Sequence, residues 1–454
     1  ENQQHHEYHT LSENDFIIKV SQKTNNIMNI IRYPERLEWN FLLKRSALQT
    51  ESLRETVCEI LEKVRTQGDR AVISYEEQFD KVKLNSLEVT EKEFEEAEKE
   101  VDIKLKAAIM LALNNIQTFH SSQKFASKKI ETLPGVTCWQ KAVAIEKVGL
   151  YVPGGTAPLF STVLMLASPA QIAGCKEIIL CTPPNREGKI HPAILYAARV
   201  AGVKRVFKTG GVQAIGAMAY GTSSIPKVYK IFGPGNQYVT VAKQQVALRD
   251  VAIDMPAGPS EVAVLADETA NPTFVASDLL SQAEHGADSQ AILITTSETL
   301  IDKVAEEVDR QLSELPRKSL AKKSLQSSKL ILVRNMQEAI DMINEYAPEH
   351  LIIETKDYTD IAEKIINAGS VFLGSYSPES AGDYASGTNH TLPTNGYAKA
   401  YSGVSLDSFI RKITFQEITR EGIATIGPAI QVMAANEHLD AHKNAITVRL
   451  NENI

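Results

Sequence analysis

Cysteine is scarce in this 454-residue sequence, and its scarcity argues against two kinds of site. The four cysteines, Cys58, Cys138, Cys175 and Cys181, form no Cys-x-x-Cys pair. Neither a thiolate zinc site nor a disulfide framework is therefore indicated. A reducing compartment fits this cysteine usage best.

The sequence also lacks an excess of basic charge and a long apolar run. Its formal net charge is -8, so no positive field is available for a phosphate backbone, and we expect no nucleic-acid partner. The most apolar stretch, LFSTVLMLASP, is too short to span a bilayer. The first residues, ENQQHHEYHTLSEND, lack the basic and apolar regions of a signal peptide. We therefore expect a cytoplasmic protein without a membrane partner.

Histidines near the N-terminus raise the question of a metal site there. His5, His6 and His9 could chelate a metal ion. A solvated tail is the better interpretation, because the surrounding residues are polar and show no apolar periodicity.

What the sequence does contain is an alternation of strand and helix patterns. The length predicts two or three domains, and 43% hydrophobic with 23% charged residues is typical of globular proteins. Residues 46–130 read as charged helices with one apolar face. From 142, short β-rich runs ending in Pro or Gly alternate with helical stretches, and the alternation resumes after 262. This pattern favours parallel sheets covered on both faces.

We therefore predict an α/β fold with two open parallel-sheet domains that resemble incomplete Rossmann folds. An N-terminal arm and a small C-terminal helical unit complete the prediction. The expected boundaries are an arm over 1–45, a first α/β domain over 46–150 and 263–404, a second α/β domain over 151–262, and the C-terminal unit over 405–454.

No G-x-G-x-x-G follows a predicted strand, so an ordinary dinucleotide fingerprint is missing. Instead, the Gly- and Pro-containing loops LYVPGG, TGGVQ and FGPGNQY carry Tyr151, Gln213 and Asn236. Ligands of doubly wound sheets bind beyond the carboxyl ends of strands, so we expect chemistry in these loops and in MPAGPSE and LGSYSPESAGDYASGTNH. A tight turn explains any one loop, but several in one domain favour a nucleotide.

Imidazole and oxygen donors gather in two other segments. Gln282 and His285, in LLSQAEHG, lie three residues apart near the end of a predicted helix, and therefore on one face. A polar helix end closed by a glycine is the alternative. The long loop 374–394 carries Asp383 and His390, and loops of this length are usually functional or mobile.

A pair of histidines near the C-terminus adds further donors. His438 and His442 are spaced one helical turn apart, with Glu437 beside them. The spacing suits half a zinc site and equally a solvated helix face. Together with the amide, imidazole and carboxylate of the preceding segments, one or both histidines make a donor set without thiolate. That set suits zinc or another borderline divalent cation in an open site.

A carboxylate and an imidazole are adjacent in YAPEHL, just before the β-rich run LIIET. Glu349 and His350 could divide general-base work, because imidazole titrates near neutrality and a carboxylate with a raised pKa can activate water. A surface turn is the alternative interpretation.

A set of motifs, taken together, resembles the L-histidinol dehydrogenase family. The motifs are YVPGGTAPLFSTVLM, FGPGNQYVTVAK, DMPAGPSEV, LLSQAEHG, APEHL, GDYASGTNHTLPT and EHLDAHKNA. They occur in the family's order and cover most of the chain from about 145 to 445. The resemblance implies a zinc-dependent oxidoreductase that oxidises L-histidinol through L-histidinaldehyde to L-histidine, the last step of histidine biosynthesis. Two NAD molecules accept the two hydrides in turn.

The resemblance also implies a role for each matching residue. The implied zinc ligands, for one Zn2+ per subunit, are Gln282, His285, Asp383 and His442. The implied catalytic pair is Glu349 and His350. The implied substrate-binding residues are Ser260, Gln282, His285, His350, Asp383, His390, Glu437 and His442, and the implied NAD contacts are Tyr151, Gln213 and Asn236. Glu284 and His438 become neighbours of ligands.

The family is a homodimer whose C-terminal unit reaches into the partner's active site. Glu437 and His442 are therefore expected to act across the interface. Two rival functions remain. One is a dehydrogenase of the same fold for another small alcohol, such as a sulfonated diol, against which His390 and Glu437 argue. The other is a zinc-stabilised dimeric scaffold, which would leave Glu349 and His350 without a purpose.

Overall fold

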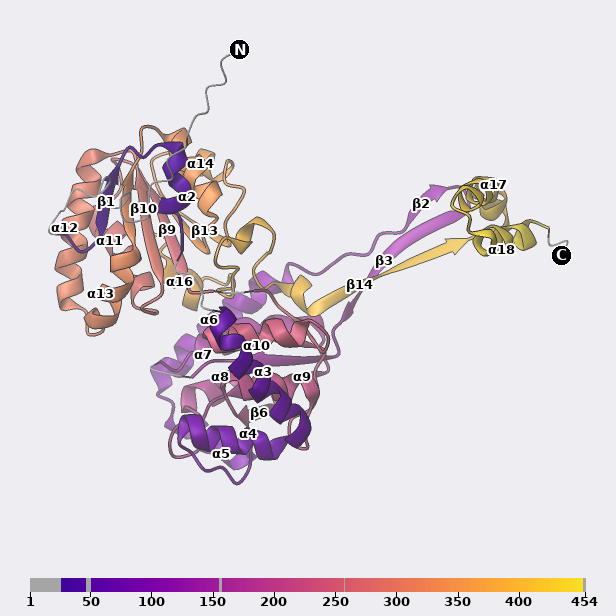
Figure 1. The fold of residues 1–454 in the computed structure, drawn as a ribbon, viewed down its shortest axis with the longest axis horizontal. Coiled ribbons are helices and arrows are strands. Elements are labelled where there is room, and N and C mark those ends of the chain that lie inside the picture. Colours follow the sequence, from indigo (N-terminus) through magenta and orange to yellow (C-terminus); the bar gives the residue numbers. More distant parts are fainter. Residues whose placement is uncertain (1–25, 46–49, 155–156, 257, 452–454) are drawn as a thin grey trace, which may run out of the picture.

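The computed structural model describes residues 26–45, 50–154, 157–256 and 258–451. Two α/β domains lie against each other, and a long arm projects from them (Figure 1). Both domains have the parallel sheets that the alternation of patterns predicts. Among the helices in the described ranges, none combines the length and apolar character needed to cross a membrane. The tail histidines His5, His6 and His9 lie outside the described residues.

The first domain contains a six-stranded sheet in which every neighbouring pair is parallel. Its spatial order is β1 (Asn29–Arg32), β11 (Lys329–Leu332), β10 (Gln290–Thr295), β9 (Glu261–Ala266), β12 (His350–Glu354) and β13 (Ser370–Leu373). All residues of β9 and β10 are buried, which suits strands covered on both faces. One face packs on α11 (Pro272–Ala283), α12 (Glu298–Glu314) and α13 (Lys318–Ser327). The other face packs on α2 (Trp39–Leu42), α14 (Met336–Tyr346) and α15 (Tyr358–Ala362).

The second domain contains a five-stranded parallel sheet. Its order is β6 (Arg205–Lys208), β5 (Glu177–Thr182), β4 (Lys147–Tyr151), β7 (Lys230–Phe232) and β8 (Ala252–Ile253). One face packs on α5 (Glu91–Glu100), α6 (Ile103–Ser121), α7 (Phe160–Ala173) and α8 (Pro192–Val200). The other packs on α3 (Thr50–Gln67), α4 (Asp69–Tyr75), α9 (Gly211–Tyr220) and α10 (Gln237–Ala247).

The structure divides the chain differently from the sequence-based expectation. The helices of 50–121 pack on the five-stranded sheet, whereas 46–150 was expected to join 263–404. An amphipathic period shows that a helix buries one face, but it does not show which sheet that face covers. Residues 29–32, expected within an arm, instead form the edge strand β1 of the six-stranded sheet.

The projecting arm is built from two distant parts of the sequence. Strands β2 (Ile130–Leu133), β3 (Val136–Ala144) and β14 (Ile410–Ile418) form an antiparallel sheet, and α17 (Arg420–Asn436) and α18 (Asp440–Leu450) stand at its far end (Figure 1). The C-terminal unit was expected to be helical from 405, so β14 is a correction. Most of its residues are exposed, so the strand has no buried face to reveal its period.

Short turns complete the description of the chain. They are η1 (Arg36–Glu38), the π-helical turn η2 (Glu76–Asp80), α16 (Glu379–Tyr384), η3 (Tyr397–Lys399) and η4 (Leu406–Phe409). In Figure 1, α16 lies at the end of the six-stranded domain that faces the five-stranded domain.

A buried ion pair ties the segment before α3 to the start of β9. The Arg45 guanidinium donates to both carboxylate oxygens of Glu261, one of them at 2.9 Å from Nη2, and to the Tyr346 carbonyl at 2.6 Å. It also lies 3.9 Å from the centre of the Tyr346 ring. The Glu261 side chain is only 2% exposed. Burial raises the pKa of Glu261, and the bond to Arg45 opposes this effect.

Replacing Arg45 should therefore destabilise the six-stranded domain. Arg45→Ala leaves a buried carboxylate without its cation, and we expect a loss of about 3–5 kcal/mol in the free energy of unfolding, measured with urea. Arg36→Ala is the matched control. The Arg36 side chain is 68% exposed, its ion pairs lie on the surface, and its guanidinium lies 4.7 Å from the centre of the Trp39 ring, so we expect a loss of only about 1 kcal/mol. Equal losses in the two variants would contradict this account.

Candidate active site

The adjacent carboxylate and imidazole of the sequence lie where β12 begins. Glu349 precedes the strand, and His350 is its first residue, in register with Val262 of β9. They therefore stand at the amino-terminal edge of the six-stranded sheet. This differs from the rule that ligands bind at carboxyl ends, which the sequence interpretation applied to both domains. The short segment 254–260 joins β8 to β9, so the carboxyl end of one sheet meets the amino end of the other.

Carboxylates surround the imidazole of His350. Its Nδ1 lies 3.7 Å from a carboxylate oxygen of Glu349 and 3.6 Å from one of Glu379. Its Nε2 lies 3.8 Å from a carboxylate oxygen of Asp383. The His350 side chain is 5% exposed, and neither ring nitrogen forms a hydrogen bond with any described residue. Each ring nitrogen therefore faces a carboxyl group just beyond hydrogen-bond distance. A small movement of the ring, or a molecule bound between the two groups, could link them.

Burial shifts the proton affinities in this cluster. It lowers the pKa of His350 to about 3, so that the ring is a neutral base at physiological pH. It raises the pKa of Glu349 well above its ordinary value, and the nearby charges of Glu261 and Asp383 add to the effect. A backbone bond from the Glu261 N–H, at 3.0 Å, opposes that shift while orienting the carboxyl group. A carboxylate with a raised pKa is a stronger base than an ordinary one.

A second set of donors converges beside this pair. Gln282 is in the last turn of α11, and its side chain is fully buried, yet neither its Nε2 nor its Oε1 has a hydrogen-bond partner in the part of the chain that the structure describes. His285 Nε2 lies 4.0 Å from an Asp383 oxygen. A buried amide without partners is unfavourable unless something else binds it. Amide oxygen, imidazole and carboxylate fit a divalent cation such as zinc.

Glu379 belongs to the same cluster, although the sequence interpretation missed it. Ligand atoms of His285, Glu379 and Asp383 all lie within 4.8 Å of one another. Glu379 is 1% exposed, its oxygens have no hydrogen-bond partner among the described residues, and burial raises its pKa well above the usual range. It precedes Asp383 by four residues on α16, so the i, i+4 spacing was the available signal.

His390 and Ser260 border the cluster. His390 Nδ1 bonds to the Asp383 carbonyl at 3.0 Å, and its Nε2 bonds to Thr162 Oγ1 of α7 at 3.1 Å. Thr162 was not singled out in the sequence. Ser260 is half-buried directly before Glu261, whose backbone N–H orients Glu349. The structure thus brings His285, His350, Asp383 and His390 together, with Gln282 and Ser260 close to His285 and Glu261 along the chain.

A cavity of about 1280 Å³ opens at the carboxyl edge of the five-stranded sheet. Tyr151, Gln213 and Asn236, expected to contact NAD, all line it. The Tyr151 hydroxyl accepts from the Gly211 N–H at 3.0 Å, and Asn236 caps the start of α10. At Gly233, with φ +126°, a Cβ would lie 2.0 Å from the Tyr151 carbonyl oxygen. The close approach of these two backbone segments therefore requires glycine.

A buried acid supports one wall of this cavity. Glu76 Oε1 accepts from Thr209 Oγ1 at 2.7 Å, from the Gly210 N–H at 3.2 Å and from Gln213 Nε2 at 2.8 Å. Burial raises the pKa of Glu76 to about 7. Its sequence surroundings, SYEEQFD, are acidic like many exposed helices, so no pattern marked this residue.

Comparison with known proteins identifies the chain's relatives. The sequence model of histidinol dehydrogenase matches residues 43–450. A histidinol dehydrogenase of Bacteroides fragilis is 73% identical over 425 residues, covering 94% of this chain and 99% of the relative. The chain belongs to the histidinol dehydrogenase family. The family's members are oxidoreductases that catalyse the last step of histidine biosynthesis, acting on L-histidinol, and in general they use NAD and zinc.

Two further relatives show how far the similarity extends. The Escherichia coli K12 histidinol dehydrogenase is 52% identical over 413 residues, covering 90% of this chain and 94% of that protein. A crystal structure of histidinol dehydrogenase from Elizabethkingia anophelis superimposes with a TM-score of 0.92 at 54% identity. It covers 94% of this chain and 99% of that one. The α/β fold predicted from the alternation of strand and helix patterns is thus confirmed.

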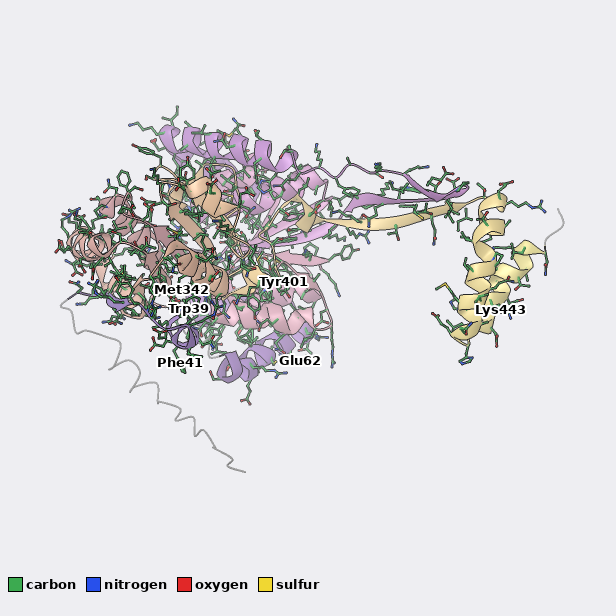
Figure 2. The ribbon with its side chains drawn as sticks, turned by 90° about the horizontal axis from the view of Figure 1, so that it is seen from above. Trp39, Phe41, Glu62, Met342, Tyr401 and Lys443 are labelled. Carbon is green, nitrogen blue, oxygen red and sulfur yellow. The ribbon has the colours of Figure 1, made fainter. Side chains whose placement is uncertain are left out.

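The C-terminal residues implied by the histidinol dehydrogenase resemblance lie apart from this cluster. Glu437 and His442 are exposed on the arm, and Figure 2 shows Lys443, the neighbour of His442, at its far end. The helical pairing considered for His438 and His442 is wrong. His438 has a left-handed φ of 57° and lies between α17 and α18, so no helix continues through both histidines.

Proposed function

We propose that this protein oxidises L-histidinol to L-histidine in two NAD-linked steps at the cluster around His350. The observation that supports this proposal is a buried imidazole enclosed by carboxyl groups, together with a buried Gln282 amide that lacks hydrogen-bond partners among the described residues. Within a chain of the histidinol dehydrogenase family, this arrangement supports proton transfer next to a metal-held substrate.

We assign the zinc ligands to Gln282, His285 and Asp383, with a fourth from His442 of the partner subunit. This assignment is supported by the 4.0 Å between His285 Nε2 and an Asp383 oxygen, and by the position of Gln282 in the last turn of α11, three residues before His285. A bound zinc would hold the imidazole and amine of L-histidinol, and NAD in the cavity would supply the hydride acceptor. Tyr151, Gln213 and Asn236 line that cavity and are the proposed nucleotide contacts.

His350 is the proposed base for the first oxidation. Its ring is neutral because burial disfavours the imidazolium, so a lone pair is available to accept the hydroxyl proton. A bound NAD would accept the hydride that leaves the same carbon as the proton is removed, and the alcohol would become an aldehyde. The adjacent Asp383 carboxylate, 3.8 Å from Nε2, can stabilise the imidazolium during this step.

Glu349 is the proposed base for the second oxidation. Its raised pKa favours accepting a proton from water, whose oxygen then bonds to the aldehyde carbon and gives a hydrate. Loss of the second hydride from the hydrate gives the carboxylic acid. The short bond from the Glu261 N–H fixes the direction in which the carboxyl group points. Holding the reacting groups in place is worth several kcal/mol.

A homodimer would complete this site. The arm exposes Val432 at 63%, Met433 at 64% and Val448 at 52%, which is unfavourable unless another surface covers them. Glu437 and His442 also lie on the arm, away from the residues that they would join. We therefore propose that the arm of each subunit reaches the partner's site. A cytoplasmic location stays a prediction.

The reaction can be tested by its stoichiometry. We expect two NADH per L-histidinol consumed, followed by absorbance, with activity lost on chelation and restored by zinc. One NADH per substrate would contradict the four-electron reaction, and activity that survives complete metal removal would contradict the zinc site. Turnover of a sulfonated diol but not of L-histidinol would keep the site and change the substrate.

The division of labour between the two bases predicts different variant kinetics. His350→Asn should slow oxidation of L-histidinol by about 100-fold or more, because the first proton has no acceptor. Glu349→Gln should slow oxidation of L-histidinaldehyde by a similar factor while sparing the alcohol step. Single-turnover absorbance with each substrate separates the two steps. Equal losses in both steps for Glu349→Gln would refute the separate role of Glu349.

A further inference from the structure

Two buried side chains outside the proposed catalytic cluster connect the domains. His120, on α6 of the five-stranded domain, is fully buried, and Asn389, in the loop after α16, is 7% exposed. Asn389 directly precedes His390, which contacts Asp383. The two side chains therefore lie between helices of the five-stranded domain and the loop that borders the cluster around His350.

The hydrogen bonds allow one arrangement of protons. The Ile116 carbonyl, 2.9 Å from His120 Nδ1, can only accept, so Nδ1 carries the proton. The unprotonated Nε2 then accepts from Asn389 Nδ2, at 3.4 Å. Asn389 Nδ2 also donates to the Met165 carbonyl of α7 at 2.6 Å. Asn389 Oδ1 accepts from the Thr391 N–H at 3.0 Å, so both amide atoms are fully used.

Further contacts attach the same loop to the same helices. Asn115 Nδ2 of α6 donates to the Ala385 carbonyl at 2.8 Å. Gly387 has φ +113°, and a Cβ there would lie 2.8 Å from the Asn115 carbonyl oxygen, so the loop approaches α6 more closely than another residue would permit. Thr162 of α7 bonds to His390. The loop is thus fixed on both sides of Asn389.

We propose that His120 and Asn389 are positioning residues. Their hydrogen bonds form a clamp that holds the loop bearing His390 against the five-stranded domain. The clamp sets the distance between the substrate-holding residues and the NAD cavity. Hydride transfer requires the reacting atoms to lie about 3–3.5 Å apart, so the spacing of the two domains controls the rate. Two NAD molecules must accept hydride from one bound substrate in turn. A fixed spacing of the two domains therefore gives both transfers the same distance between the reacting atoms. This inference rests on the proposed function.

Substitutions of equal length test the clamp. His120→Gln places an amide oxygen where Nε2 accepts from Asn389, whereas His120→Met has similar length and no acceptor. Asn389→Asp keeps the shape but removes both donated bonds. We expect His120→Met and Asn389→Asp to lower kcat/KM for L-histidinol at least about tenfold, since small misplacements slow reactions strongly. His120→Gln should stay within about threefold of the wild type.

The readouts distinguish positioning from loss of folded protein. In His120→Met and Asn389→Asp, the deuterium isotope effect with L-histidinol labelled at the carbinol carbon should rise, because hydride transfer becomes slower. Zinc content and the KM for NAD should stay at wild-type values, since neither residue is assigned to those sites. If Asn389→Asp does not fold, Asn115→Ser, which removes the bond to Ala385, takes its place.

Three results would overturn the clamp. They are wild-type kinetics in His120→Met and Asn389→Asp, equal losses in His120→Gln and His120→Met, and a lower rate with an unchanged isotope effect. Failure of the proposed function is distinguishable, because wild-type protein would then not oxidise L-histidinol. In that case the same comparison is made with the alcohol that the wild type does oxidise.

Discussion

The structure depends on one constraint: a group of polar side chains is buried at the edge of a sheet without enough partners in its own chain. Gln282 has no hydrogen-bond partner for either polar atom in the described ranges, and the carboxyl groups of Glu349 and Glu379 have strongly raised pKa values. Removing such groups from water is unfavourable unless they are bound by something else. In the function proposed above, a divalent cation, a polar substrate and the arm of a partner subunit together supply the partners that the single chain lacks.

The rest of the fold holds these buried polar side chains in place and keeps water away from them. The Arg45 ion pair neutralises Glu261, whose backbone N–H orients Glu349. The segment 254–260 carries the chain from the carboxyl edge of one sheet to the amino edge of the other, so the cavity lined by Tyr151 belongs to the domain that faces the cluster. The contacts of Asn389 with α6 and α7 then hold the two halves together.

The sequence predicted the parts of the fold that have a strong local pattern. Fully buried strands such as β9 are continuous apolar runs, and Gly- and Pro-containing loops mark their ends, so both parallel sheets could be expected. The sheet on which the helices of residues 50–121 pack could not be predicted, because an amphipathic helix face can cover either sheet. Strand β14 was not predicted, because most of its residues are exposed and no regular alternation of apolar and polar residues marks it as a strand. The motif resemblance supplied roles that spacing alone left open.

Three features of the site could not be predicted, each for a different reason. Glu379 shares a helix face with Asp383, but a carboxylate in an acidic, Ser-rich loop looks like a solvated one until burial is known. Glu76 supports the cavity across a long sequence separation, through bonds to Thr209 and Gln213 that no local pattern encodes. The placement of Glu349 and His350 at an amino-terminal edge follows from how the two sheets meet, which is a tertiary property.

The most direct test of this account is whether the arm completes the site of the other subunit. His350→Asn and His442→Ala subunits, each expected to be nearly inactive alone, are coexpressed with different affinity tags, and L-histidinol oxidation by the mixture is measured. If the arm acts across the interface, each mixed dimer has one intact site, and random assembly restores about a quarter of wild-type activity. If both residues act within one chain, no intact site forms, and a mixture without activity would contradict the account.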